Sequence, residues 1–387
     1  MTTPAASAAD QRKLKIGIVC PYDYCHPGGV VLHISHTARE FMKMGHEVKI
    51  VSPVSKKGIS YFGEAVIPVG RPFPWPNAGA IARIPITPWL GFQTYYVLHR
   101  EKFDILHIHE PYTPMLAWSA VNESPSVNIA TFHAYHTKPR GYWIGKPVLM
   151  RASKKLARKI AVSNAALRFV SRHLPGDYLI IPNGVDTDRF SCDVMPKPEL
   201  RDGKLNILFV GRFEKRKGVP YLIEAYRQVK RELPNTRLIL VGPGKVLRRQ
   251  CEEMVAGAGL SDVHFVGFVP GEELPAYYRA ADVFCSPALY GESFGIVLIE
   301  AMASCVPVVA SDIDGYNSVL THEKEGLLVP PHDPDRLAEA LVRLLKDRGL
   351  RQQYADAGKT KARNYSWENI ARRLMDIYFD ALQEAER

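Results

Sequence analysis

The chain has 387 residues, a length that favours two domains over a single core. Hydrophobic residues make up 46% of it and charged residues 23%, which is the balance of a globular protein and excludes a mainly disordered one. No run of about 20 apolar residues occurs, so no membrane span is expected. Residues 1–13 are small and polar, and we expect a disordered tail without the apolar core of a signal peptide.

The basic excess lies entirely in the first half of the chain. Residues 1–200 hold 24 Lys and Arg against 14 Asp and Glu, whereas the remainder holds 26 of each. Such a surface favours an anionic partner: a phospholipid head group, a nucleic acid or an acidic substrate. A solvated face without a partner is the alternative.

Short apolar runs alternate with amphipathic segments from residue 15 onward. In the first half we expect strands at 15–20, 47–51, 103–109, 127–132 and 159–162, with a helix at 30–44. The pattern restarts after a Pro-rich linker at 196–203, with strands at 205–210, 237–241, 263–266, 283–286 and 306–310. Helices at 220–232, 247–256 and 274–281 separate these strands.

This alternation predicts an α/β protein with two Rossmann-like, doubly wound domains that face each other across a cleft. The expected boundaries are 14–198 for the first domain and 199–365 for the second. An amphipathic last helix, residues 366–387, is expected to pack back on the first domain. Ligands of such sheets bind at the carboxyl ends of the strands.

Two loops at predicted strand ends are suited to a diphosphate. Gly28 and Gly29 lie between a strand and a helix, where a bare backbone and a helix N-terminus can approach phosphates. Arg212 and Lys217 flank a loop after a strand, and together they can neutralise a leaving diphosphate. Each feature also occurs as an ordinary tight turn or a solvated basic loop.

The segment from Gly291 to Met302 is the most informative. Glu292 is expected in a loop, Ser293 as a helix cap and Glu300 inside the helix. The two carboxylates would lie roughly 12 Å apart along a helix axis, a span that suits a nucleoside-diphosphate sugar. A buried carboxylate without a partner is costly, which disfavours a purely structural Glu300.

Eight short segments carry a recognisable pattern: 19–22 (VCPY), 27–30 (PGGV), 107–111 (HIHEP), 130–133 (ATFH), 181–186 (IPNGVD), 211–212 (GR), 216–218 (RKG) and 291–298 (GESFGIVL). Together they resemble the GT-B glycosyltransferases of family 4 (GT4), and among them the phosphatidylinositol mannosyltransferases. The resemblance implies a retaining, metal-independent transfer that needs no cofactor. The implied donor is a nucleotide-diphosphate sugar.

The same resemblance implies roles for individual residues. Arg212 and Lys217 would stabilise the leaving diphosphate, Glu292 would bind the sugar and Glu300 the ribose. The implied catalytic residues are His133, Arg212, Lys217 and Glu292. The implied donor-binding residues are Gly28, Gly29, Glu292, Ser293, Phe294, Gly295, Ile296 and Glu300.

On the acceptor side, Tyr22, Arg83 and Lys138 match positions that hold the inositol phosphate in the mannosyltransferases. Three nearby positions depart from that pattern, where polar residues would be expected. The chain has Ala78, Ala80 and Tyr112 there.

Aromatic residues recur at helical spacing between residues 89 and 100. The expected membrane-contacting set is Trp89, Phe92, Tyr96 and Arg100. The family uses a helix in this place to lie on the membrane, and interfacial aromatic and basic residues suit that role. A buried stripe in the protein core is the alternative.

No metal site or disulfide is predicted. The six cysteines form no CxxC pair, so reduced thiols are expected. The segment His107-Ile108-His109-Glu110 places two histidines on one strand face, but no further ligand cluster is visible in the sequence. Two DxD segments, 186–188 and 312–314, are expected to be structural.

The favoured function is transfer of mannose from GDP-mannose to a phosphatidylinositol-type lipid. The enzyme would act in the cytoplasm, bound peripherally to the inner face of the membrane. Its partners would be the sugar donor and an anionic lipid, with no nucleic acid. The alternatives are hexosyl transfer from a UDP-sugar to diacylglycerol or a soluble acceptor, a sugar-nucleotide epimerase, and a non-catalytic nucleic-acid-binding protein.

Overall fold

The computed structural model describes residues 12–387, apart from residues 27, 57, 78–79 and 134–145. The chain forms two compact units. Unit 1 comprises residues up to Asn183 together with Trp367–Arg387, and unit 2 comprises Gly184–Ser366. Among the described helices, none is long and apolar enough to cross a bilayer.

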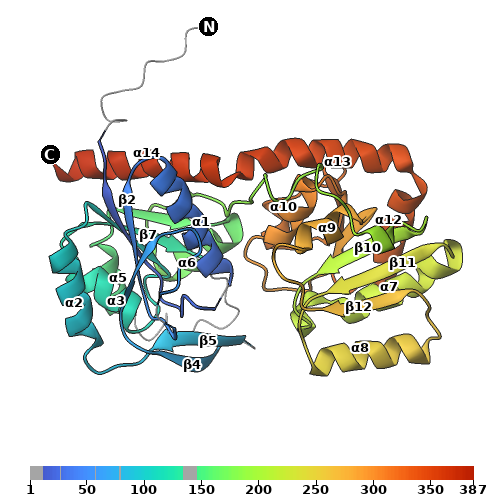
Figure 1. Ribbon diagram of the computed structural model, residues 1–387, viewed down its shortest axis with the longest axis horizontal. Helices are drawn as coiled ribbons and strands as arrows, with labels where there is room; N and C mark the ends of the chain where they lie inside the picture. The colour runs from blue at the N-terminus through green and yellow to red at the C-terminus, as the bar shows by residue number, and fades with distance from the viewer. Residues whose placement is uncertain (1–11, 27, 57, 78–79, 134–145) are drawn as a thin grey trace, which may run out of the picture. The chain divides into compact units, whose positions relative to one another are not determined.

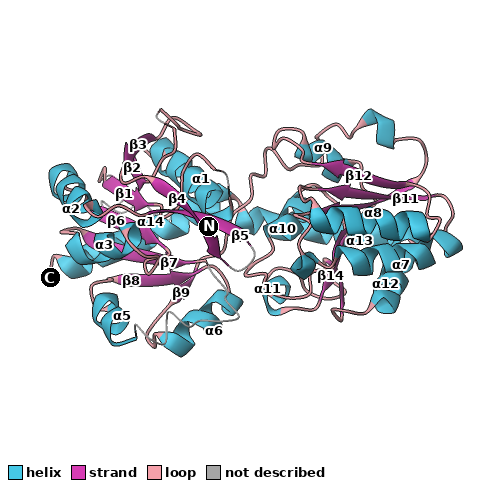
Figure 2. Ribbon diagram, turned by 90° about the horizontal axis from the view of Figure 1, so that it is seen from below, coloured by secondary structure: helices cyan, strands magenta, loops and turns pink. Residues whose placement is uncertain are grey.

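Unit 1 is built on a seven-stranded parallel sheet with the strand order β3-β2-β1-β6-β7-β8-β9 (Figure 2). The strands are β1 (Lys15–Val19), β2 (Glu47–Ser52), β3 (Ala65–Pro68), β6 (Ile105–His109), β7 (Val127–Phe132), β8 (Arg158–Ala161) and β9 (Leu179–Ile180). An antiparallel pair, β4 (Pro72–Asn77) and β5 (Ala80–Pro85), forms a separate ribbon. The described helices are α1 (Gly29–Lys43), α2 (Leu90–Glu101), α3 (Leu116–Glu123), α5 (Lys146–Ser153), α6 (Asn164–His173) and α14 (Trp367–Ala385).

Helices cover both faces of this sheet because its strands are apolar on both sides. Ile16, Ile18 and Ile105 pack on one face, in a core shared with α1 and α14. Leu106 and Ile108 pack on the other, in a core shared with α2 and α3. The alternation along β6 therefore directs His107 and His109 toward the face that α1 and α14 cover.

Unit 2 has a six-stranded parallel sheet with the order β12-β11-β10-β13-β14-β15. The strands are β10 (Leu205–Val210), β11 (Thr236–Val241), β12 (Val263–Gly267), β13 (Val283–Ser286), β14 (Val308–Ser311) and β15 (Gly326–Val329). The helices are α7 (Val219–Glu232), α8 (Val246–Gly257), α9 (Leu274–Arg279), α10 (Ile296–Ala303), α11 (Asp314–Asn317), α12 (Pro334–Lys346) and α13 (Arg348–Ala362), with short 3-10 turns at Pro198–Leu200, Lys215–Lys217 and Arg363–Tyr365.

In both sheets the strand order reverses once, between β1 and β6 in unit 1 and between β10 and β13 in unit 2. Loops that leave neighbouring strands at such a point diverge to opposite faces and leave a crevice for a ligand. The two doubly wound sheets confirm the predicted fold class.

The division between the units lies at Asn183 and Gly184, earlier than the predicted boundary at 198/199. The reason is that Val185 and Phe190 are buried in the core of unit 2. The Val185 backbone N–H also donates to the Tyr365 carbonyl at 2.7 Å, which ties the first segment of this unit to its last. The last helix, α14, packs on α1 within unit 1 (Figure 1).

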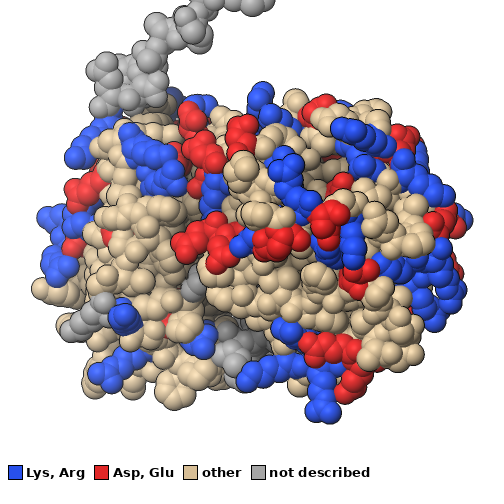
Figure 3. Space-filling view, turned by 45° about the vertical axis from the view of Figure 1, so that its right-hand side comes forward, with Lys and Arg blue, Asp and Glu red and all other residues tan. Residues whose placement is uncertain are grey.

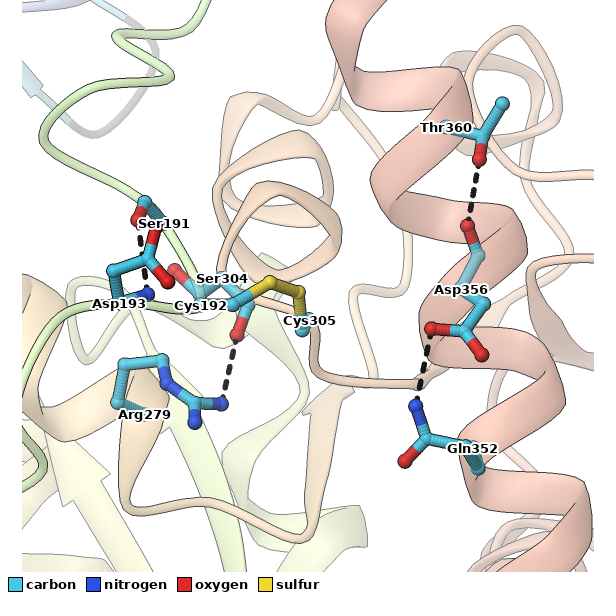
Figure 4. Close-up of a disulfide and its surroundings, with 9 residues drawn as sticks. All are labelled: Ser191, Cys192, Asp193, Arg279, Ser304, Cys305, Gln352, Asp356 and Thr360. Carbon is cyan, nitrogen blue, oxygen red and sulfur yellow. Dashed lines mark hydrogen bonds between the residues drawn. A yellow bond between two sulfur atoms is a disulfide. The ribbon is translucent and has the colours of Figure 1, made fainter.

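One pair of cysteines departs from the expected reduced state. Cys192 and Cys305 form a disulfide in unit 2, with their Cα atoms 5.5 Å apart (Figure 4). No sequence pattern predicts this pair, because the two cysteines are 113 positions apart and only the fold brings them together. The bridge joins the segment that enters unit 2 to Cys305, two residues after the end of α10.

Candidate active site

The basic loop after β10 and the acidic loop after β13 meet at the reversal point of the unit 2 sheet. Lys217 Nζ lies 2.6 Å from a carboxylate oxygen of Glu292, and Arg216 forms an ion pair with the same oxygen. Only 11% of the Lys217 side chain and 12% of the Glu292 side chain are exposed. The predicted diphosphate-binding and sugar-binding residues are thus neighbours.

A glycine makes this approach possible. Gly218 has a φ of +69°, and a Cβ atom there would lie 1.9 Å from the carbonyl oxygen of Pro287. A backbone hydrogen bond of 2.7 Å from Leu289 N–H to the Arg216 carbonyl holds the two loops together. Any side chain at position 218 would therefore separate Lys217 from Glu292.

Arg212 lies near the start of the same loop, two residues after β10. About half of its side chain is exposed (52%), and its guanidinium lies 3.0 Å from Glu214. Glu214 also pairs with Arg216 at 2.8 Å. The cluster therefore presents three cations and two carboxylates, with Arg212 the most accessible cation.

The helix after Glu292 begins later than the sequence predicted. Gly295, with a φ of +95°, is the N-cap of α10, and Ser293 is not. A Cβ atom at Gly295 would lie 2.7 Å from the Tyr316 ring, so only glycine fits this turn. Phe294 is buried beside it, and Ile296 is the first helical residue. The two glutamates are eight residues apart in the sequence, but only the second half of that interval, from Ile296 to Glu300, is helical.

Glu300 is held by a hydrogen bond. The Tyr278 hydroxyl donates to Glu300 Oε2 at 2.8 Å. Burial raises the pKa of Glu300 to about 7, and the Tyr278 hydrogen bond opposes that rise. Glu300 is therefore a partnered carboxylate in an apolar helix that changes charge near neutral pH.

In unit 1 the glycine loop after β1 leads directly into α1. Gly28 is the N-cap of α1 and Gly29 its first residue. A Cβ atom added at either position would have no heavy atom within 4 Å. Both glycines are exposed, and the first N–H groups of a helix have no intrahelical partner, so they are suited to bind an anion.

His133 follows β7 and is fixed by two hydrogen bonds. Its backbone N–H donates to Glu110 Oε1 at 2.6 Å, and its Nε2 lies 2.8 Å from His109 Nδ1. Burial lowers the pKa of His133 well below its usual value, so the ring is neutral at pH 7. Burial likewise lowers the pKa of His33 to about 4 and that of His107 to about 3.

The structure describes two of the three predicted acceptor residues, Tyr22 and Arg83. Tyr22 lies in the loop after β1, and the backbone of its neighbour Asp23 donates to the Arg83 carbonyl at 2.9 Å. The structure thus brings the Tyr22 loop against β5, which carries Arg83. Lys138 and Ala78 lie outside the described residues.

The aromatic side chains of α2 are exposed. Trp89 is 73% exposed and Phe92 72%, and Tyr96 is also exposed, with Arg100 packed over its ring. The residues of α2 that face the core are Leu90, Thr94, Val97, Leu98 and Glu101. The alternative of a buried aromatic stripe was therefore wrong.

Comparisons with known proteins identify the family of the chain. A family model described as Glycosyltransferase Family 4 matches residues 27–189, and one described as Glycosyl transferases group 1 matches residues 193–361. A phosphatidyl-myo-inositol mannosyltransferase of Mycobacterium leprae (strain TN) is 38% identical over 368 residues, which cover 94% of this chain and 96% of the relative. The chain belongs to glycosyltransferase family 4.

Two solved structures share the GT-B fold of this glycosyltransferase. A glycosyltransferase from Rickettsia africae ESF-5 has a TM-score of 0.79 at 19% identity and covers 96% of this chain and 99% of its own. Anabaena Alr3699/HepE, solved in complex with UDP, has a TM-score of 0.75 at 19% identity and covers 94% and 99%. The family resemblance read from the motifs is confirmed.

Some site residues of this glycosyltransferase were not predicted. Arg216 was visible only as part of a motif, and its ion pair with Glu292 depends on the turn at Gly218. His33 and His109 join His133 in one buried group, although the sequence showed no such cluster. The two DxD segments make local hydrogen bonds, such as Asp186 with the Arg189 backbone and Asp312 with Asn317.

Proposed function

We propose that this glycosyltransferase moves mannose from GDP-mannose to a phosphatidylinositol-type lipid at the cytoplasmic face of the membrane. The transfer retains the anomeric configuration and needs no metal ion. The contact between Lys217 and Glu292 in unit 2 is the observation that carries this proposal. It joins a cation suited to a diphosphate with a carboxylate suited to sugar hydroxyls.

The leaving diphosphate is stabilised by Arg212 and Lys217. Negative charge develops on the diphosphate as the bond to the sugar breaks, and fixed cations lower the energy of that state most. Lys217 is held in place by Glu292, so it needs little reorganisation. Arg212 is exposed enough to close on the phosphates. Gly28 and Gly29 are also proposed donor-binding residues, through the backbone N–H groups at the start of α1.

The nucleoside is held by Glu300. A carboxylate accepts hydrogen bonds from both hydroxyls of a ribose, and Tyr278 fixes the orientation of this one. Because the pKa of Glu300 is raised to about 7, donor binding depends on pH close to neutrality. Ser293, Phe294 and Gly295 connect Glu292 to this helix, whose first residue is Ile296.

The acceptor side rests on unit 1. The names of the mycobacterial relatives support a phosphatidylinositol acceptor. Tyr22, Arg83 and Lys138 are the proposed head-group contacts. His133 is neutral and doubly hydrogen-bonded, so it is suited to orient the acceptor hydroxyl without carrying charge.

The exposed aromatic side chains of α2 support docking on a membrane. Trp89, Phe92 and Tyr96 expose large apolar surfaces close to Arg100, which suits the boundary of an anionic bilayer. Phe73 and Trp75 of β4 are also more than half exposed. On the face shown in Figure 3, by contrast, acidic and basic side chains are interspersed.

Product analysis tests the proposal. The purified protein is incubated with vesicles that contain phosphatidylinositol or diacylglycerol and with GDP-mannose, UDP-glucose or UDP-galactose, with and without a chelator. Mass spectrometry should detect one hexose added to phosphatidylinositol with GDP-mannose, equally in the presence of the chelator. NMR of the product should show the anomeric configuration of the donor. A product formed only on diacylglycerol, or only from a UDP-sugar, would contradict the acceptor or the donor.

A further inference from the structure

Three buried imidazoles from separate elements of unit 1 converge at one point. They are His33 in α1, His109 at the end of β6 and His133 just after β7. One ring nitrogen from each lies within 4.8 Å of the other two, and the residues are 2%, 0% and 9% exposed. Imidazole nitrogen is a preferred ligand of divalent zinc, copper and nickel ions.

The hydrogen bonds around the cluster leave lone pairs inside it. Asn183 Oδ1 lies 2.9 Å from His33 Nδ1. Because an amide oxygen only accepts, Nδ1 of His33 carries the proton and its Nε2 keeps a lone pair. Such an outer partner fixes the tautomer of a metal-binding histidine.

His109 and His133 share one proton between Nδ1 and Nε2, which are 2.8 Å apart. A cation can take the place of this proton if His109 moves it to Nε2. Among the described residues, Nε2 of His109 is buried and has no hydrogen-bond partner. The change of tautomer therefore breaks no other hydrogen bond.

Two further residues lie beside the three histidines, the acidic residue Glu110 and a fourth histidine, His107. Glu110 is buried and accepts from the His133 backbone at 2.6 Å, so a carboxyl group lies beside the cluster. The nearby His107 is not available as a ligand. Its two ring nitrogens are engaged by the Tyr378 hydroxyl at 2.6 Å and the Thr131 hydroxyl at 2.7 Å. A bound ion would keep an open position besides its three ligands.

We propose that His33, His109 and His133 form a binding site for one divalent ion of the zinc class, and that its occupation inhibits sugar transfer. Inhibition follows because a metal-bound His133 no longer orients the acceptor. The proposed inhibition rests on the proposed function, whereas the proposed binding of the ion does not.

Binding is tested on the full chain after dialysis against a chelator. Titration with Zn²⁺ against a chromophoric chelator should give one ion per chain. His33→Gln and His109→Gln should each weaken binding by about tenfold or more. His264→Gln, at an exposed position of β12 in unit 2, should leave it unchanged. Equal affinity of the wild type and the His109→Gln variant would overturn the site.

A second measurement needs no variant. The electron paramagnetic resonance spectrum of the wild type with one equivalent of Cu²⁺ should show coupling to several imidazole nitrogens. A spectrum with one nitrogen or none would overturn the proposal even if the histidine variants fail to fold.

The inhibitory half is tested by activity. Zn²⁺ should lower product formation, and chelator should restore it. Binding of the ion with unchanged transfer would overturn inhibition alone. If no nucleotide sugar is turned over, the proposed function fails, and the ion-binding result still decides the site.

Discussion

Lys217 Nζ and Glu292 Oε1 lie 2.6 Å apart although 75 residues separate them in the chain. The ammonium belongs to the loop after β10 and the carboxylate to the loop after β13, on the two strands between which the sheet order reverses. Both side chains are nearly buried, so the pair is fixed before any substrate arrives. In the proposed reaction, this preorganisation would make Lys217 an effective partner for the leaving diphosphate.

Replacing Lys217 by alanine should lower kcat by about 10² to 10³, because one fixed charge opposite the leaving group is lost. Steady-state rates with GDP-mannose and phosphatidylinositol vesicles measure this. Lys215 is the matched control, since it is an exposed lysine in the same 3-10 turn. Lys215→Ala should change the rate by no more than about twofold. Equal losses in both variants would show that only the general charge of the loop matters.

Donor binding should strengthen as the pH rises through 7. The pKa of Glu300 is raised to about 7, so its ionised fraction grows about tenfold between pH 6 and pH 8. In the proposed donor complex the ionised form of Glu300 accepts hydrogen bonds from both ribose hydroxyls, so KM for the nucleotide sugar should fall in proportion. Isothermal titration with GDP at each pH measures the same change without turnover.

Two variants check the origin of this pH dependence. Glu300→Gln should bind weakly at every pH and show a flat profile. Tyr278→Phe removes the hydrogen bond that favours the carboxylate, so the midpoint should move to higher pH. A Glu300→Gln profile as steep as that of the wild type would assign the titration to another group.

The double variant Trp89→Ser, Phe92→Ser should bind anionic vesicles at least about tenfold more weakly, since each aromatic ring contributes apolar area to the interface. Co-sedimentation with phosphatidylinositol-containing vesicles measures this. Phe268, at 75% exposure in unit 2, provides the control. Comparable loss in Phe268→Ser would mean that any exposed aromatic contributes, and α2 would have no special role.

Cys192→Ser should lower the stability of unit 2 by about 2–4 kcal/mol under oxidising conditions, because the bridge closes a long loop. Denaturant unfolding measures the loss. A reductant should destabilise the wild type by a similar amount and leave Cys192→Ser unaffected. Cys25→Ser, at a free cysteine of unit 1, should behave as the wild type. No difference between oxidised and reduced wild type would contradict a structural role.

The sequence predicted features that depend on local patterns. The strand at 205–210 was predicted with its observed bounds, because a continuous apolar run ends at Gly211. Alternating strands and helices predict a doubly wound sheet, in which the strand order reverses once. The loops that bear Lys217 and Glu292 follow the two strands at this reversal, which is why they could be assigned to one site. The ribbon of β4 and β5 was missed because prolines at 72, 74 and 76 argue against a strand.

Features that depend on distant residues could not be predicted. His33 and Asn183 are 150 positions apart and meet only when α1 packs beside the end of the sheet. The bridge between Cys192 and Cys305 likewise needs the finished fold of unit 2. The start of α10 at Ile296 follows from the contact of Gly295 with Tyr316, which local propensity does not contain.

A crystal structure with bound GDP-mannose tests the central claim most directly. The account predicts that the diphosphate lies within hydrogen-bonding distance of Arg212 and Lys217, and that the ribose hydroxyls contact Glu300. A donor bound elsewhere, with these three side chains untouched, would contradict it.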